Sequence, residues 1–212
     1  MGGMDITILL GAPGSGKGTA AAAVAAADSS LRHVSSGDLL RAAVAQGTPA
    51  GVEAKGFMDA GRLVPDALVA RMVADAVAAG GASTMLLDGF PRNLAQAEML
   101  EKMGAPVRSA VLVDVPDSAI QDRIAGRRTC PKCKAGYHVK NLPPKKEGVC
   151  DKCGTALVVR KDDTPETVAD RLAVYHRETE PLVEYYKSRG LLRRIDGTAG
   201  AAQVAAAFRE AM

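Results

Sequence analysis

The stretch that most constrains this chain is Leu9–Thr19, which reads LLGAPGSGKGT. The apolar residues Ile6–Leu10 predict a buried strand, and the alanine-rich run after Thr19 predicts a helix. The glycines between them let backbone N–H groups approach an anion, while the helix N-terminus and Lys17 supply positive charge. The G-x-x-x-x-G-K spacing that begins at Gly11 therefore predicts a phosphate-binding loop.

One position departs from the general phosphate-loop pattern. Gly18 follows the lysine, and the hydroxyl comes one residue later, at Thr19. The alternative is a glycine-rich turn that binds nothing. The lysine and both flanking elements are in place, so we favour the phosphate site.

Length and composition predict one globular core. The chain has 212 residues, of which 47% are apolar, enough for a core with a small inserted unit. No segment approaches the roughly 18 apolar residues that a membrane helix needs. The N-terminal stretch MGGMDITILLG lacks the basic start and cleavage site of a signal peptide. We therefore expect a cytoplasmic protein with no membrane partner, and nothing in the sequence demands more than a monomer.

Alternating strands and helices predict an α/β fold with a central five-stranded parallel sheet and helices on both faces. The expected strands are Ile6–Leu10, His33–Val34, Met85–Leu87, Val107–Val115 and Leu191–Ile195. The run Val107–Val115 is the most β-branched and is expected to be central. Ser36 or Asp38 is expected to cap the helix after the second strand, and Pro65 to occupy the first turn of another.

The carboxyl ends of the expected strands carry polar residues. The loop from Gly11, Asp88 and Asp196 each follow a strand directly. Ligands bind at this edge of such sheets, so the sequence places a ligand site there.

The segment after Gly126 breaks the pattern and contains four cysteines. Cys130 and Cys133 form one C-x-x-C pair and Cys150 and Cys153 another, with sixteen residues between the pairs. This spacing is typical of a structural zinc site with no open ligand position, in a zinc-ribbon-like insert. Zinc is expected ahead of iron or cobalt, with the metal actually loaded left open. Tight pairs and a reducing compartment disfavour disulfides. His138 remains an alternative ligand.

Basic residues are unevenly distributed. The segment from Arg123 to Lys161 carries a charge of +9, whereas the whole chain carries only +3. A basic block suggests a polyanion partner, and the alternative is a solvated lysine-rich surface. Arginine suits phosphate, but periodicity alone does not show whether the arginines converge on Lys17. The candidate arginines are Arg41, Arg62, Arg92, Arg123, Arg127, Arg160 and Arg171.

Motifs along essentially the whole chain resemble the adenylate kinase family, in its long bacterial form with a metal-binding lid. Lys-Gly-Thr at the end of the phosphate loop is normal in nucleoside monophosphate kinases. The matching stretches are GAPGSGKGT at 11–19, SSGDLLR at 35–41, MDAGRLVPD at 58–66, LLDGFPRNLAQA at 86–97, DRIAGRR at 122–128, RKDD at 160–163, the helix holding Arg171, and DGT at 196–198.

The resemblance implies a division of the chain. Residues 1–34, 65–125 and 164–212 would form the phosphate-loop core, residues 35–64 a mobile AMP-binding segment, and residues 126–163 the zinc-binding lid.

The resemblance also implies residue roles. Gln96 would read the adenine edge of AMP, and Asp38 and Asp88 would orient Mg²⁺ through water. ATP would be bound by Gly14, Ser15, Gly16, Lys17, Gly18, Thr19, Arg123, Arg127, Gly136, Tyr137 and Ala199. AMP would be bound by Ser36, Arg41, Arg62, Leu63, Val64, Gly89, Phe90, Pro91, Arg92, Gln96, Arg160 and Arg171. Catalysis would rest on Lys17, Arg92, Arg123, Arg160 and Arg171.

The implied reaction is reversible phosphoryl transfer from ATP to AMP, giving two ADP, with Mg²⁺, in-line geometry and lid closure. Within enzymes the alternative is a UMP or CMP kinase. From another class, it is a phosphate-loop ATPase with a zinc knuckle that binds nucleic acid. Tyr137 is the one aromatic residue in that segment, so we expect no nucleic-acid partner. Three residues depart from the family pattern, in which Ala20 is usually Gln, Ser36 commonly Thr and Arg62 commonly Lys.

Overall fold

The computed structural model describes residues 4–104 and 106–212. Residues 1–3 belong to the predicted core range 1–34 and to the N-terminal stretch that lacks signal-peptide features, and residue 105 belongs to the predicted core range 65–125. They lie outside the described residues. Among the described helices, none is long and apolar enough to cross a membrane.

A parallel sheet forms the centre of the described chain, as the sequence predicts. The order of its five strands is β2-β3-β1-β4-β7. Their bounds are β1 Asp5–Leu10, β2 Leu31–Ser35, β3 Thr84–Asp88, β4 Val107–Asp114 and β7 Leu192–Asp196. The strand in the middle is β1, and β4 lies between β1 and β7, which confirms the expectation that Val107–Val115 is a central strand. Both β1 and β4 are interior strands buried on both faces, and apolar composition cannot rank two such strands.

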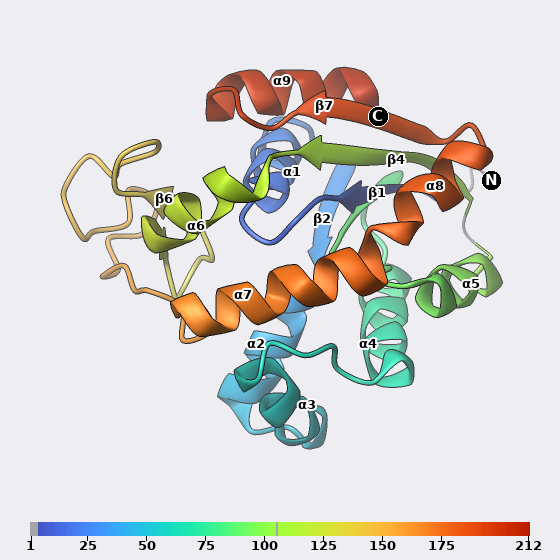
Figure 1. The fold of residues 1–212 in the computed structure, drawn as a ribbon, viewed down its shortest axis with the longest axis horizontal. Coiled ribbons are helices and arrows are strands. Elements are labelled where there is room, and N and C mark those ends of the chain that lie inside the picture. The colour runs from blue at the N-terminus through green and yellow to red at the C-terminus, as the bar shows by residue number, and fades with distance from the viewer. Residues whose placement is uncertain (1–3, 105) are drawn as a thin grey trace.

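Helices cover both faces of the sheet (Figure 1). Helices α1 and α9 pack on one face, and α4, α5 and α8 pack on the other. The bounds are α1 Lys17–Ala27, α2 Ser36–Gln46, α3 Pro49–Asp59, α4 Asp66–Ala78, α5 Leu94–Lys102, α6 Asp117–Ala125, α7 Pro165–Val174, the π-helical turn η1 Tyr175–Thr179, α8 Pro181–Ser188 and α9 Ala201–Ala211.

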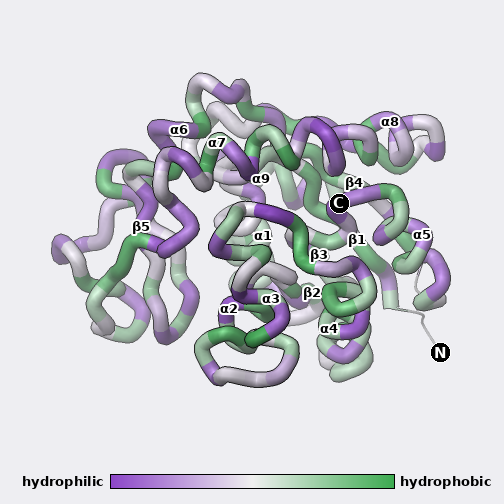
Figure 2. The backbone as a smooth tube through the Cα atoms, turned by 60° about the horizontal axis from the view of Figure 1, so that its bottom comes forward, coloured by the Kyte–Doolittle hydropathy of each residue, from purple (hydrophilic) through white to green (hydrophobic). Residues whose placement is uncertain are grey.

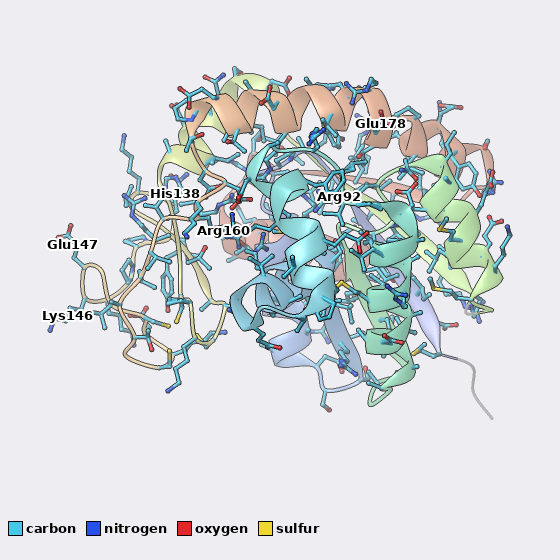
Figure 3. All side chains as sticks on the ribbon, turned by 90° about the horizontal axis from the view of Figure 1, so that it is seen from below. Arg92, His138, Lys146, Glu147, Arg160 and Glu178 are labelled. Atoms are coloured by element: carbon cyan, nitrogen blue, oxygen red, sulfur yellow. The ribbon has the colours of Figure 1, made fainter. Side chains whose placement is uncertain are left out.

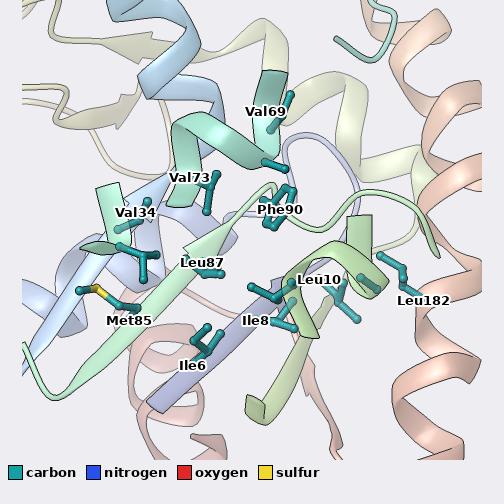
Figure 4. Packing of buried hydrophobic residues seen from close by; sticks show 14 of the residues in the cluster. Ile6, Ile8, Leu10, Val34, Val69, Val73, Met85, Leu87, Phe90 and Leu182 are labelled. Atoms are coloured by element: carbon teal, nitrogen blue, oxygen red, sulfur yellow. The ribbon is translucent and has the colours of Figure 1, made fainter. Parts of the chain in front are cut away.

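Alternation along β1 divides the core into two layers. Ile6, Ile8 and Leu10 pack toward α4 and α8, together with residues such as Met85 (Figure 4). Leu9 packs on the opposite face against α1. Successive strand residues point to opposite faces, so one apolar run supplies both layers.

Two helix starts differ from the sequence prediction. Ser35, rather than Ser36 or Asp38, caps α2, because β2 runs straight into the helix and the Ser35 hydroxyl accepts from Asp38 N at 3.3 Å. Pro65 lies at the N-cap of α4, one residue before the first turn. Both differences concern a boundary and leave each helix where the pattern predicts it.

The 126–163 insert is built from two matching cysteine knuckles and a two-stranded antiparallel sheet, β5 Arg127–Thr129 with β6 Gly136–His138. Its loops stand apart from the helices that cover the main sheet (Figure 2). In the knuckles, Cys130 N donates to Ala135 O and Cys150 N to Thr155 O, both at 2.9 Å. The insert therefore has regular local structure where the sequence shows no periodicity.

Candidate functional site

The phosphate loop joins β1 to α1 at the carboxyl edge of the sheet. Gly14 and Gly16 have φ values of +83° and +94°, a conformation that side chains rarely adopt. Helix α1 begins at Lys17, and Lys17 Nζ donates to Ala12 O at 3.1 Å. The loop thus directs a helix N-terminus and an ammonium group toward one point, which is the geometry of an anion site.

A steric contact explains why residue 18 is a glycine. A Cβ at this position would lie 2.7 Å from Asp88 Oδ2, so a side chain cannot be accommodated unless Asp88 moves. The hydroxyl therefore falls on Thr19, which the close approach of β3 to the loop explains.

Asp88 and Lys17 form the electrostatic centre of the loop. Burial lowers the pKa of Lys17 to about 8, the Asp88 carboxylate opposes that shift, and the charges of Arg92 and Arg171 add to it. Burial would raise the pKa of Asp88, but a hydrogen bond from His33 and the charge of Lys17 hold it below its ordinary value. The ammonium is thus poorly solvated and surrounded by cations, which favours an incoming polyanion.

A cavity lies close to this loop, since the charges of Arg92 and Arg171 in its wall act on Lys17. Eight of the residues predicted to bind AMP line the cavity: Ser36, Arg41, Arg62, Leu63, Val64, Arg92, Gln96 and Arg171. Gly89 does not line it, but its carbonyl accepts from Ser36 Oγ at 2.7 Å. Gly37, Leu40, Met58, Gly61, Val69 and Asp162 also line the cavity. Phe90 packs into the hydrophobic core instead (Figure 4), and Pro91 beside it is buried. Of the lining arginines, Arg62 is exposed and lies 5.3 Å from the Phe57 ring.

The arginines converge, which periodicity alone could not establish. Burial lowers the pKa of Arg92 and of Arg160 to about 10, and in each case the charge of Arg41 contributes. Arg171 has its pKa lowered by burial and by Arg127, against the opposing charge of Asp162. Residues from α2, the loop after β3, the insert and α7 thus form one cationic cluster, in which Figure 3 labels Arg92 and Arg160.

Backbone and side-chain contacts hold the cluster in place. Arg92 Nε donates to Gly89 O at 2.9 Å, and Arg160 Nε to Thr129 Oγ1 at 3.0 Å. Arg41 Nη2 donates to Asp38 Oδ1 at 2.7 Å. Asp38, one of the two acids implied for Mg²⁺, therefore already has an ion-pair partner.

Two carboxylates in the cluster have no role in the sequence prediction. Asp163, whose side chain is 0% exposed, forms an ion pair with Arg127, and Asp162 Oδ2 lies 3.1 Å from Arg171 NH1. Burial would raise the pKa of Asp162, but Arg171 and other arginines hold it below its ordinary value. The sequence feature that could have identified these two acids is the Asp-Asp pair of RKDD, directly before Thr164, the N-cap of α7. These acids attach the end of the insert to the cationic cluster.

The end of α6 and residue Gly136 of the insert lie against the phosphate loop. Arg123, at the end of α6, donates from NH1 to Ser15 O at 3.1 Å, and a Cβ on Gly136 would lie 3.6 Å from Thr19 Oγ1. The Tyr137 side chain, predicted to lie in the ATP site, packs among the cysteines. The buried Ser15 hydroxyl has no hydrogen-bond partner in the described part of the chain.

Ala199 lies in the loop between β7 and α9. It is half-buried just beyond β7, where Thr198 N donates to Asp196 Oδ1 at 2.8 Å in a tight turn. The turn places it at the same edge of the sheet as the phosphate loop.

The four cysteines meet at one point. Their sulfur atoms all lie within 4.8 Å of one another, with Cys130 Sγ 3.4 Å from Cys153 Sγ and Cys133 Sγ 3.5 Å from Cys150 Sγ. Four thiolates at this spacing suit one tetrahedral ion with Zn–S distances of about 2.3 Å. Because each knuckle contributes both of its cysteines, the donor set fits a structural zinc ion. His138 Nδ1 instead accepts from two backbone N–H groups.

Comparison with known proteins agrees with this geometry. A family model described as adenylate kinase matches residues 9–191. The chain is 48% identical to an adenylate kinase of Lachnospira eligens over 90% of this chain and 92% of the relative. It is 45% identical to an adenylate kinase of Carboxydothermus hydrogenoformans over 97% and 98% of the two chains. A relative from Clostridium tetani is 48% identical over 90% of each chain.

Proposed function

Because the chain belongs to the adenylate kinase family, we propose that it transfers the terminal phosphoryl group of ATP to AMP and releases two ADP, with Mg²⁺ as the cofactor of ATP. The observation that carries the proposal is the cavity beside the phosphate loop, with Arg92 and Arg171 lining it and their charges acting on Lys17. A donor site and an acceptor site would share these cations.

The donor site would be the loop from Gly14 to Thr19. Its backbone N–H groups and Lys17 would hold the outer phosphates, and Arg123 and Arg127 would approach from the insert side. Ala199 would lie near the adenine of ATP.

The acceptor site would be the cavity. The phosphate of AMP would meet Arg41, Arg92 and Arg171 at its inner end, and the base would reach Gln96. The attacking atom is a phosphate oxygen that is already anionic at neutral pH, so no general base is required. Catalysis would consist of in-line positioning and stabilisation of charge by Lys17 and the arginines.

Magnesium would neutralise charge on the phosphates of ATP. Asp88 suits the role implied for it, because its carboxylate is ionised and lies beside the loop at Gly18. It would hold the ion through water, while Asp38 would first have to leave Arg41.

Water must be kept from the transferring group, or ATP would be hydrolysed. We assign this task to the 126–163 insert, which would close over ATP as a lid and bring Arg160 with it, while residues 35–64 close over AMP. Figure 3 shows Arg160 on the side of the insert toward the rest of the molecule, with Lys146 and Glu147 at its outer tip. Zinc would keep the insert rigid without touching the reaction.

The decisive experiment is a coupled assay with ATP and one monophosphate at a time. We expect AMP to be the preferred acceptor and turnover to require Mg²⁺. Faster turnover of UMP or CMP than of AMP would overturn the assignment in favour of a pyrimidine monophosphate kinase.

All proposed residues come from one chain, and we propose that a cytoplasmic monomer is active; sedimentation at assay concentration tests this state. The nucleic-acid alternative predicts salt-dependent binding of an oligonucleotide. We expect none, because the Tyr137 ring is buried among the cysteines and offers no face for a base to stack on.

A further inference from the structure

The side-chain amide of Gln96 is held from both ends. Its Oε1 accepts from Arg92 N at 2.7 Å, and its Nε2 donates to Asp66 Oδ1 at 2.7 Å. The residue is 1% exposed and lines the cavity. Gln96 thus reaches the acceptor cavity with its amide already fixed.

The orientation of this amide follows from its neighbours. A backbone N–H can only donate and an ionised carboxylate can only accept, so the atom facing Arg92 N is the oxygen and the atom facing Asp66 is the nitrogen. A flipped amide would place N–H against N–H and oxygen against oxygen. Each contact would then cost the free energy of an unpaired buried polar group.

Asp66 is itself held in place. Asn93 Nδ2 lies 3.0 Å from Oδ1 and 3.2 Å from Oδ2 of Asp66, while Asn93 Oδ1 caps α5 by accepting from Gln96 N at 2.8 Å. Asp66 is the first residue of α4, and Gln96 lies in the first turn of α5. The carboxylate therefore connects the starts of two helices and cannot turn away from Gln96 without breaking these contacts.

We propose that Asp66 is a positioning residue that sets the choice of acceptor base, by locking the Gln96 amide in one orientation. The inference rests on the proposed function, in which Gln96 meets the base of AMP. After the two internal contacts, the amide retains one N–H and one oxygen lone pair. Adenine presents an acceptor at N1 and an amino donor beside it, which match those two groups.

The lock also predicts which bases are rejected. Hypoxanthine and guanine present N1–H and a carbonyl oxygen, the reverse of adenine, so they face the fixed amide with donor against donor and acceptor against acceptor. Uracil shows the same reversed pattern, whereas cytosine shows the adenine-like one. A site built to hydrogen-bond one pattern can discriminate strongly against a ligand that leaves its buried groups unpaired.

The test compares AMP with IMP, which differs from AMP only at this edge of the base. In Asp66→Asn, residue 66 can donate as well as accept, so only the contact with Arg92 N still opposes a flipped Gln96 amide. We expect the ratio of kcat/KM for AMP to that for IMP to fall about 10-fold, with KM for ATP unchanged. Asp75→Asn removes the same charge from an exposed position of the same helix and should leave the ratio at the wild-type value.

The outcomes separate this inference from the proposed function. A wild-type enzyme that does not prefer AMP to IMP would refute the assigned acceptor site itself. If the wild type prefers AMP but Asp66→Asn keeps the same ratio, or loses activity equally on both acceptors, the positioning role is wrong. Asp66→Ser, whose hydroxyl also donates and accepts and which suits a helix start, repeats the measurement should the Asn variant fold poorly.

Discussion

The sheet core and the 126–163 insert are held together by different interactions. In the core, Ile6 and Ile8 are 0% exposed and belong to a large apolar cluster. In the insert, the buried cluster centres on Cys130, Tyr137 and Cys150, while Val159 is 52% exposed. Hydrophobic burial can stabilise the first region alone, whereas the second needs a metal to supply what its few apolar side chains do not.

This difference matters because the proposed site draws on both regions. Lys17 and Arg92 are carried by the core, and Arg127 and Arg160 by the insert. A perturbation of the insert should remove its arginines from the site and leave the phosphate loop folded. The predictions below separate the two regions.

Loss of the metal should have the largest effect. Structural zinc contributes on the order of 10 kcal/mol to the folding of small metal domains, so Cys130→Ser should unfold the insert. We expect metal analysis to fall from about one zinc per chain to almost none, with a lower melting temperature and fast hydrogen exchange confined to residues 126–163.

Ile8→Ala is the matched control, because a core cavity costs about 2–5 kcal/mol and should lower the stability of the whole sheet while zinc stays bound. Equal exchange across both regions in Cys130→Ser would show that the insert and the core unfold together. Absence of metal, or disulfides in freshly purified protein, would refute the zinc site.

Removal of the loop ammonium should abolish most of the activity while both regions stay folded. Lys17→Met deletes a charge that the proposed mechanism places on the transferring phosphates, and we expect kcat to fall about 10³-fold. Zinc content and the far-UV spectrum should stay unchanged. Lys187→Met, at an exposed site on α8, controls for the loss of a lysine. Near-normal turnover by Lys17→Met would exclude the loop as the donor site.

These two sites could be predicted from sequence because each is local. The phosphate loop spans Leu9–Thr19, and the cysteine knuckles repeat one short spacing. Short continuous apolar runs likewise predict the strands, since a strand buried on both faces is apolar at successive positions. The order of the strands in the sheet leaves no such pattern in the sequence, because it depends on how the crossover helices pack.

The contacts that shape the acceptor cavity were beyond prediction from sequence for the same reason. Asp66 and Gln96 are thirty residues apart and meet only because α4 and α5 pack side by side. Asp162 and Asp163 resemble ordinary polar residues of a loop until the fold brings Arg127 and Arg171 against them. Pairings between distant elements determine these contacts, and one sequence does not report them.

Lys17 should make the stability of the nucleotide-free protein depend on pH. Burial lowers the pKa of Lys17 from its ordinary value to about 8 in the folded chain, so between about pH 8 and 10.5 the unfolded chain binds more protons. The contribution of Lys17 to the free energy of unfolding therefore rises with pH across this window, by about 3 kcal/mol in all, and is constant below it.

Urea unfolding of wild type and Lys17→Met at several pH values measures this contribution, because other lysines and tyrosines titrate alike in both proteins. The wild type should gain stability relative to the variant as pH rises through the window. Parallel curves would mean that the ammonium is better solvated than its burial implies.

The smallest effect is expected at Tyr137, which adjusts the metal affinity of the insert but supplies no metal ligand. Its hydroxyl accepts from Asp151 N at 2.8 Å and lies 3.4 Å from Cys150 Sγ, so its hydrogen is directed at the sulfur. A donor to a ligating thiolate stabilises the charged ligand, and loss of such a partner costs about 10-fold or more in metal affinity. Tyr137→Phe keeps the ring and removes both hydrogen bonds of the hydroxyl, the one to Cys150 Sγ and the one from Asp151 N. We expect zinc to be released about 10-fold more readily to a competing chelator, with the melting of the core unchanged.

Tyr185→Phe removes a hydroxyl bonded to Glu101, far from the insert, and should release zinc as the wild type does. If Tyr137→Phe behaves like this control, the cysteines and their backbone turns alone set the zinc affinity, and the Tyr137 hydroxyl contributes nothing to it.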